Sequence, residues 1–215
     1  MALKIRQYGP EDREAVGRIC VLTGDIGNDA TGQFVTDELL PYVYAYPYVE
    51  YAPDLAFVIE AEDGEVVGYI IGVSDVLQMA DWAAGEWAEE YDRALPVDDS
   101  WTAKDVELKT RGADPSSRVH QFTDEYPAEL HIDMLPAAQG GGMGRKLVTT
   151  LARALADRGV DGLALGVAAD NESAVGFYKK LGFKVLRVDE WDGKVGGYLM
   201  GLDIPKFLAE ADARA

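Results

Sequence analysis

The 215-residue sequence predicts an α/β domain built on a mixed sheet. Three observations predict it. Short segments with the apolar–polar alternation of strands recur between segments with helical periodicity. Turn sequences at Glu62–Glu65 and Asp192-Gly193 join neighbouring strands as hairpins towards the two ends of the chain. The hydrophobic content of 48% and the charged content of 27% suit one compact domain, and we expect residues 1–215 to form it.

The first third of the chain is expected to supply three strands and two helices. Leu3–Arg6 alternates apolar and polar residues, and Pro10 suits the first turn of a helix. In that helix Val16, Ile19 and Cys20 recur at helical spacing. The expected elements are a strand over 3–6, a helix after Pro10, a loop over 24–32, a short helix over 37–40 ended by Pro41, and strands over 55–60 and 65–73.

Residues 76–129 have a different pattern from the segments on either side. They contain two acidic helical stretches, near 80–94 and 103–111, connected through Pro96–Ser100. A turn-rich break follows over 113–117. We therefore expect residues 76–129 to form a helical insertion ahead of the next strand.

The last third of the chain again alternates strands with helices. Leu147, Val148, Leu151 and Leu155 share one helical face, and Gly159 is a typical residue to follow a helix end. The expected elements are a strand over 130–135, a helix over 145–158, a strand over 163–167, a helix over 172–181, and strands over 183–188 and 195–202.

The charge of the chain is strongly acidic and unevenly distributed. The formal net charge is −18, which disfavours nucleic-acid binding because polyanion-binding proteins are normally basic. Residues 1–129 hold 27 acidic and 9 basic side chains, whereas residues 130–215 hold 11 of each. Two interpretations remain open: the acidic part solubilises the protein, or it attracts a cationic substrate.

Cysteine content and hydropathy indicate the compartment. The single Cys20 can form no intrachain disulfide, and no apolar run approaches the roughly 20 residues that a membrane span needs. We expect a cytoplasmic protein that does not bind membranes.

The most informative segment, Leu130–Arg145, joins a strand through a glycine-rich turn to a helix. Glycines let backbone N–H groups converge on an anion, and a helix N-terminus adds unpaired donors and a positive dipole end. A Walker loop is excluded because Gly144 is followed by Arg-Lys-Leu. A dinucleotide fingerprint is excluded because its third glycine would fall on Arg145 or Leu147. The segment therefore predicts a different phosphate or pyrophosphate site.

Two motifs identify the family that this site resembles. Gln139-x-x-Gly142-x-Gly144 resembles the acetyl-CoA loop of the GCN5-related N-acetyltransferases, the GNAT family. Downstream, Leu163–Val167 is followed by Asn171-x-x-Ala-x-x-Phe-Tyr178, which resembles the second signature of that family. The resemblance implies a GNAT fold, with a central mixed and mostly antiparallel sheet flanked by helices. It also implies acetyl-CoA as cosubstrate, no metal, and an amine acceptor.

A narrower resemblance extends over more of the chain. Ile5–Tyr8, Asp63–Tyr69, Leu130–Met134 and Phe177–Gly182 look like the acetyltransferase-like C-terminal domain of animal O-GlcNAcase. That domain also carries a long segment before the cofactor strand but has lost the glycine loop. The resemblance implies a free-standing bacterial relative that still holds acetyl-CoA.

The family resemblance implies the roles of the site residues. The backbone of strand residues 132–134 is expected to pair with the pantetheine arm, the loop 140–145 to hold the pyrophosphate, and Asn171 to contact the pantetheine. The residues expected to bind the cofactor are Ile132, Asp133, Met134, Gln139, Gly140, Gly141, Gly142, Met143, Gly144, Arg145, Asn171 and Tyr178.

The resemblance also implies direct attack of the amine on the thioester, with no acyl-enzyme. Tyr178 matches the general acid of the family, and a phenol with a pKa near 10 is protonated at neutral pH. Gly166 stands where many relatives place a glutamate base. We expect Asp133 to serve instead, with Asp170 as the second candidate.

Structural interpretations of these residues remain open. Tyr178 could simply pack against Phe177, Asn171 could cap a helix, and Asp133 could pair with His131. Histidines are more often structural than catalytic, so we leave His131 and His120 out of the candidate site. The tyrosines at 42–51 and the tryptophans of the insertion fit either an acceptor pocket or aromatic packing.

Three functions therefore compete. The favoured one is an acetyl-CoA-dependent N-acetyltransferase acting on an amine, with a cationic amine as the natural partner of an acidic protein. The second is a catalytically silent acetyl-CoA-binding module with a regulatory or docking role. The third is a protein acetyltransferase acting on lysine tails. The oligomeric state is left open, with a homodimer as one possibility.

Overall fold

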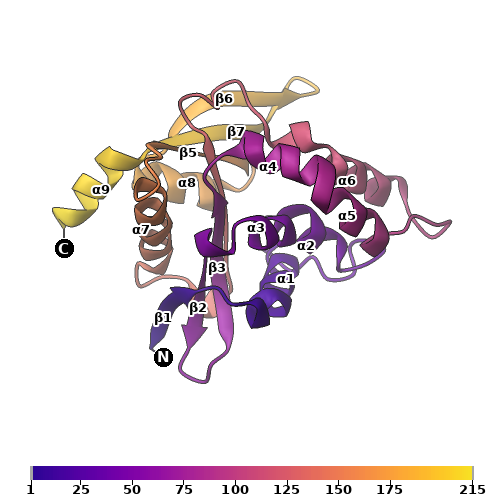
Figure 1. The fold of residues 1–215 in the computed structure, drawn as a ribbon, viewed down its shortest axis with the longest axis horizontal. Helices are drawn as coiled ribbons and strands as arrows, with labels where there is room; N and C mark the ends of the chain where they lie inside the picture. The colour runs from indigo at the N-terminus through magenta and orange to yellow at the C-terminus, as the bar shows by residue number, and fades with distance from the viewer. Residues whose placement is uncertain (1, 215) are drawn as a thin grey trace.

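The computed structural model describes residues 2–214 and contains one seven-stranded sheet with helices on both faces (Figure 1). Each of the seven strands was expected from the sequence pattern, to within two residues at most ends. The spatial order is β1-β2-β3-β4-β5-β7-β6. The strands are β1 Leu3–Gln7, β2 Ala56–Ala61, β3 Val66–Val73, β4 Ala128–Met134, β5 Gly162–Ala168, β6 Lys184–Trp191 and β7 Lys194–Asp203.

The β4–β5 pair is parallel and every other neighbouring pair is antiparallel, which confirms a mixed, mostly antiparallel sheet. The parallel pairing is short: Ala128 pairs with Leu163 and Glu129 pairs with Ala164, and the two strands then separate. The other edge of β4 stays paired with β3 along its whole length. The sheet therefore opens between β4 and β5.

The helices divide between the two faces of the sheet. In Figure 1 α7 lies on one side of the strands and α1, α2 and α3 lie on the other. A Cβ added at Gly72 would meet Leu151 of α7, so the even-numbered residues of β3 face α7. The helices are α1 Arg13–Leu22, α2 Leu39–Tyr44, α3 Tyr46–Tyr51, α4 Val76–Trp82, α5 Ala88–Ala94, α6 Ala103–Ala113, α7 Met143–Ala156, α8 Glu172–Leu181 and α9 Ile204–Asp212.

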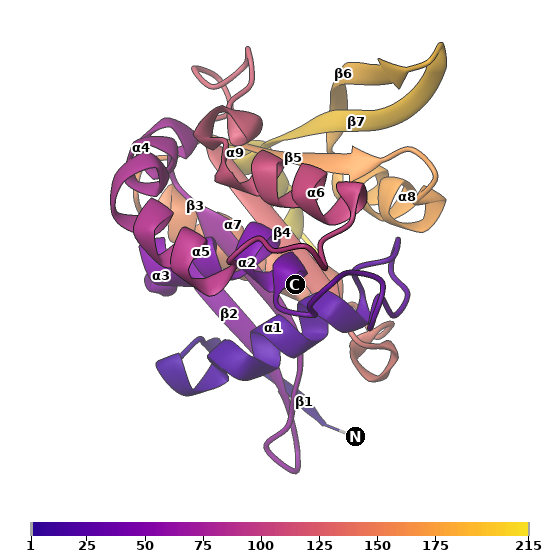
Figure 2. The same ribbon diagram turned by 90° about the vertical axis from the view of Figure 1, so that its right-hand side faces the viewer.

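The segment between β3 and β4 is helical. It contains α4, a π-helical turn over Ala83–Trp87, α5, α6 and a 3-10 turn over Pro115–Arg118. Figure 2 shows α4, α5 and α6 beside the N-terminal helices, and α6 contacts α2. The rings of Trp82 and Trp87 stack with centroids 5.7 Å apart, and Trp87 stacks on Tyr42 at the same distance. Aromatic packing therefore accounts for these side chains.

Three differences from the expected elements have physical reasons. The short helix does not end at Pro41, because this proline is the third residue of α2, where its missing N–H would have no intrahelical acceptor. Part of the tyrosine-rich segment forms α3. The helix α9 was not expected, although Asp203 accepts a hydrogen bond from the Lys206 amide at 2.9 Å and Pro205 lies in the first turn, both common start signals.

Candidate active site

A cavity of about 890 Å³ lies where β4 and β5 separate. Residues of β4 and β5 form its base, and the loop ahead of α7 and one side of α8 form one wall. The end of α1, the loop after it and residues of α2 form the opposite wall, including Thr23, Gly27, Leu40 and Tyr44. The cavity therefore connects a glycine-rich loop to a pocket beside the N-terminal helices.

The β4 edge that faces the cavity has free backbone groups. Ile132, Asp133 and Met134 pair with β3 on one side, while the parallel pairing with β5 has already ended at Glu129. All three residues line the cavity. An extended molecule with amide groups can add to this edge as a further strand would.

The glycine loop ahead of α7 has the conformation of an anion site. Gly140, Gly141 and Gly142 have φ angles of +81°, +54° and +77°, a region that other residues rarely adopt. Within residues 2–214, the N–H groups of these three glycines and of Arg145 have no hydrogen-bond acceptor. These donors and the positive end of α7 can bind a pyrophosphate.

Neighbouring side chains hold this loop against β4 and α8. The Gln139 side-chain amide donates to the Met134 carbonyl at 2.9 Å, which ties the loop to the end of β4. A Cβ added at Gly144 would lie 2.9 Å from Cζ of Phe177, so glycine permits the close approach of α7 and α8. Arg145 donates to the Lys180 carbonyl at 3.1 Å and also lines the cavity.

Tyr178 reaches the cavity from α8. Its ring packs between Phe177 and Phe183, with centroids 5.3 Å from each. Its hydroxyl has no hydrogen-bond partner within the described chain. The hydroxyl oxygen is nevertheless not fully buried, and because Tyr178 lines the cavity, we infer that this oxygen faces it. Burial and the nearby Asp133 raise the pKa of Tyr178 above its usual value, which keeps the phenol protonated. Packing and a role as proton donor are therefore compatible.

Asp133 lies on the side of β4 that faces α1–α3. Its cross-strand partner is Tyr69, whose hydroxyl donates to the carboxylate. Burial raises the pKa of Asp133 above its usual value, and the hydrogen bond from Tyr69 opposes that rise. Asp133 is the only carboxylate among the cavity-lining residues of the described chain. A carboxylate in this setting can accept a proton or hold an ammonium group.

Other expected site residues occupy different positions. Asn171 accepts a hydrogen bond from the Ala174 amide at 3.0 Å as the N-cap of α8, and it also lines the cavity. Gly141 and Met143 lie in the loop and first turn of α7 but do not line the cavity. Asp170 is exposed in the turn after β5, so the structure does not bring it together with Asp133 and Tyr178.

Sequence reasoning left out His131, which lines the cavity. Its Nε2 lies 3.2 Å from the Tyr48 hydroxyl, and that hydroxyl lies 2.6 Å from the Glu129 carboxylate. One signal was available: Glu129, His131 and Asp133 alternate along one strand and must share one face of it. The tyrosine partner comes from α3, which the sequence pattern did not predict.

No group of three or more His, Cys, Asp and Glu side chains in residues 2–214 is arranged to hold a metal ion. Among the described helices none has the length and hydropathy needed to cross a bilayer.

A cavity with an open strand edge at its base and an anion-binding loop at one end suits a coenzyme A thioester, and such a site is typical of proteins that bind this class of molecule. Comparison with known proteins narrows this class of proteins. The model of the Acetyltransferase (GNAT) family matches residues 25–183, and the chain belongs to this family.

Solved structures agree with this assignment. The crystal structure of SsHAT is 33% identical, covers 95% of this chain and 99% of its own, and superposes with a TM-score of 0.84. The structure of yncA, an acetyltransferase from Salmonella typhimurium solved with its cofactor acetyl-CoA, is 19% identical, covers 95% of each chain and has a TM-score of 0.55. The latter likeness shows the fold alone.

The curated relatives match a short stretch of the chain. The mycothiol acetyltransferase of Amycolatopsis mediterranei (strain U-32) is 52% identical over 73 residues, which cover 31% of this chain and 24% of that protein. The mycothiol acetyltransferase of Nocardia farcinica (strain IFM 10152) is 42% identical over 76 residues, which cover 34% and 24%. The match therefore spans about a quarter of the length of these relatives.

Proposed function

We propose that this protein is an N-acetyltransferase that transfers the acetyl group of acetyl-CoA to a cationic amine. The observation that carries the proposal is the arrangement of Tyr178 and Asp133, which enter one cavity from α8 and β4 at the open end of the strand pair. Tyr178 is suited to give a proton and Asp133 to take one, and both lie beside the strand edge that we expect to bind the thioester.

Each part of the chain has a separate task in this reaction. Acetyl-CoA supplies the acetyl group. The loop amides and Arg145 bind the pyrophosphate, and the free edge of β4 aligns the pantetheine. Asp133 takes a proton from the incoming ammonium group, which frees the nitrogen lone pair to form the new C–N bond. Tyr178 donates its proton to the sulfur as the C–S bond breaks.

The charges around the cavity support a cationic acceptor. The two lining cations, Arg145 and Lys180, come from α7 and α8 on the cofactor side. On the side of the N-terminal helices, the described residues that line the cavity carry no positive charge, and Asp133 supplies a negative one. A carboxylate-bearing acceptor would lack a partner there, whereas an ammonium group would gain one.

Narrower assignments belong to the same proposal. We assign the chain to the bacterial relatives of the O-GlcNAcase acetyltransferase-like domain on the motifs given above, and to the cytoplasm, where acetyl-CoA is consumed. We also treat residues 1–215 as one domain with the segment 76–129 as its insertion.

Two measurements test this function. Calorimetric titration with acetyl-CoA should show binding by the wild type and strong loss in Gly142→Asp, which places a negative charge where the loop is expected to hold phosphate. A panel of amines, diamines and lysine peptides should then show CoA thiol release by the wild type. Tyr178→Phe should still bind acetyl-CoA and release thiol about 10²–10⁴-fold more slowly.

The outcomes separate the competing functions. Binding of acetyl-CoA without thiol release for every acceptor would favour the silent module. Release with lysine peptides alone would favour the protein acetyltransferase. No binding of acetyl-CoA by the wild type would refute the cofactor site.

A further inference from the structure

Three side chains of β4 that face α1–α3 form a continuous polar row. Glu129, His131 and Asp133 occupy alternate positions of the strand, so successive members lie roughly 7 Å apart along it. Tyr48 of α3 bridges the first two, at 2.6 Å from Glu129 and 3.2 Å from His131. His131 and Asp133 both line the cavity.

The bridge determines which nitrogen of His131 carries the proton. Because the Tyr48 hydroxyl has one hydrogen and lies 2.6 Å from a carboxylate, it donates to Glu129. Its oxygen is then available as an acceptor for an Nε2–H of His131. When the neutral imidazole carries its proton on Nε2 in this way, Nδ1 keeps its lone pair. Within residues 2–214 Nδ1 has no hydrogen-bond partner, and it is not fully buried. Because His131 lines the cavity, we infer that Nδ1 faces it.

We propose that His131 is a second proton acceptor of the active site, positioned by Tyr48 and Glu129 so that Nδ1 takes a proton from the attacking nitrogen. The proposal deepens the proposed function, on which its catalytic part rests. His131 is the catalytic residue of the group, and Tyr48 and Glu129 are positioning residues.

The proton balance of the reaction explains why two acceptors are useful. An acceptor that arrives as R–NH₃⁺ leaves as R–NH–acetyl, so its nitrogen loses two protons. Asp133 takes the first before the C–N bond forms, and His131 takes the second as the C–S bond breaks. Tyr178 gives one proton to the departing sulfur and is reprotonated from solvent. One proton is therefore released for each acetyl group transferred.

The surroundings of His131 keep its ring neutral until that step. Tyr44 of α2 and Tyr48 of α3 contact the ring, with centroids 5.8 Å and 4.9 Å away. The guanidinium of Arg118 lies over the Tyr48 ring, 5.7 Å from its centroid. Burial and the positive charge of Arg118 lower the pKa of His131 to about 4. Such a weak base still accepts a proton from a nitrogen already bound to the carbonyl carbon, because that nitrogen is far more acidic than a free ammonium. Glu129, through Tyr48, stabilises the imidazolium that results.

The first test needs no acceptor. The chain has two histidines, so two-dimensional ¹⁵N–¹H spectra of the imidazoles contain two sets of signals, which His120→Gln assigns. His131 should be neutral at pH 7, protonated at Nε2 and unprotonated at Nδ1. Tyr48→Phe should abolish the preference for the Nε2–H tautomer. The control is Tyr91→Phe, which removes another hydroxyl, one that lies 2.9 Å from the Lys109 carbonyl, and it should leave the tautomer unchanged. An Nδ1–H tautomer or an imidazolium at pH 7 would overturn the proposal.

The second test uses an amine that the wild type acetylates. His131→Gln and Glu129→Gln should each lower kcat about tenfold or more with little change in acetyl-CoA affinity, and Tyr91→Phe should have no effect. An unchanged kcat in His131→Gln would overturn the catalytic role. If no amine is acetylated by the wild type, the proposed function fails and the catalytic role of His131 fails with it. A wrong tautomer, by contrast, overturns the proposed role of His131 and leaves the proposed function standing.

Discussion

The half-buried imidazole of His131 makes a specific prediction about stability in acid. The pKa of His131 is lowered from 6.5 to about 4 in the folded chain. A group whose folded pKa is depressed contributes stability above its unfolded pKa, and that contribution is lost as the pH falls towards its folded pKa. The affected window therefore extends from about pH 6.5 down to about pH 4.

The magnitude follows from the two pKa values. At pH 5 the unfolded chain binds nearly a full proton at this position, whereas the folded chain binds about a tenth of one. Lowering the pH from 7 to 5 should therefore reduce the free energy of unfolding by up to about 2 kcal/mol through His131. The value is an upper bound because the ring is open to the cavity on one side.

Urea denaturation of the wild type and of His131→Gln at pH 7, 6 and 5 measures the contribution of His131 to the free energy of unfolding. Other titrating groups, including His120, are present in both proteins and cancel in the difference. Between pH 7 and pH 5 the free energy of unfolding of the wild type should fall up to about 2 kcal/mol further than that of the variant. For an m-value near 2 kcal/mol/M, this difference shifts the urea midpoint by about 1 M. Parallel pH dependence of the two proteins would refute the lowered pKa of His131.

Three further predictions concern other parts of the chain. Asp133→Asn should raise the thermal midpoint of unfolding at neutral pH, because the raised pKa of the Asp133 carboxyl makes its ionised form destabilising. The same variant should lower kcat/KM by about 10²–10⁴-fold in the thiol-release assay. Gly142→Ala should cost about 1–2 kcal/mol in urea denaturation, because φ is +77° there, and should weaken acetyl-CoA binding in calorimetry. Asp12→Asn should lower the free energy of unfolding by about 2 kcal/mol in urea denaturation, because the buried carboxylate accepts two hydrogen bonds from Arg6. The hydrogen bonds from Arg6 lower the pKa of Asp12, so the wild type should lose stability in acid as this carboxyl is protonated.

The cofactor side of the site could be predicted from sequence because its residues are contiguous. The strand, the glycine turn and the helix N-terminus follow one another over residues 128–156, so local geometry alone orients the loop amides. The positive φ values of Gly140–Gly142 agree with that expectation. The separation of β4 from β5 could not be predicted from local pattern, since both segments read as ordinary strands.

The part of the cavity beside the N-terminal helices, where we propose that the acceptor binds, is assembled from distant segments, so local pattern indicates little of it. Asp133 was found through its place on the strand, but its partner Tyr69 comes from β3 and the Tyr48–Glu129 contact joins residues 81 positions apart. The helix that carries Tyr48 has a proline at its second residue and only six residues in all, too short for a periodic signal. Sequence reasoning left out His131 because the contacts that position its ring join segments far apart in the sequence.

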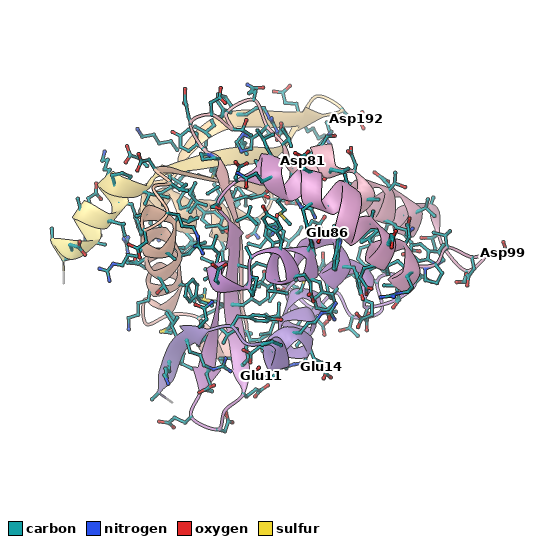
Figure 3. The ribbon with its side chains drawn as sticks, in the orientation of Figure 1. Glu11, Glu14, Asp81, Glu86, Asp99 and Asp192 are labelled. Atoms are coloured by element: carbon teal, nitrogen blue, oxygen red, sulfur yellow. The ribbon has the colours of Figure 1, made fainter. Side chains whose placement is uncertain are left out.

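The uneven charge also follows from the geometry of the site. A molecule as anionic as coenzyme A would be repelled by acidic groups near the loop, and there the cavity is lined by Arg145 and Lys180. The acidic excess lies elsewhere: Glu11 and Glu14 near α1, Asp81 and Glu86 on the inserted helices and Asp99 in the loop beyond them project outward (Figure 3). We propose that the cavity wall formed by the end of α1 and by α2 receives the acceptor, and these side chains lie on or beyond the helices on that side of the sheet. The electric field of these carboxylates would raise the local concentration of a cationic amine, and salt would screen that field. If the acidic side chains attract the acceptor, its KM should increase with ionic strength. If they only keep the protein soluble, the KM should not change.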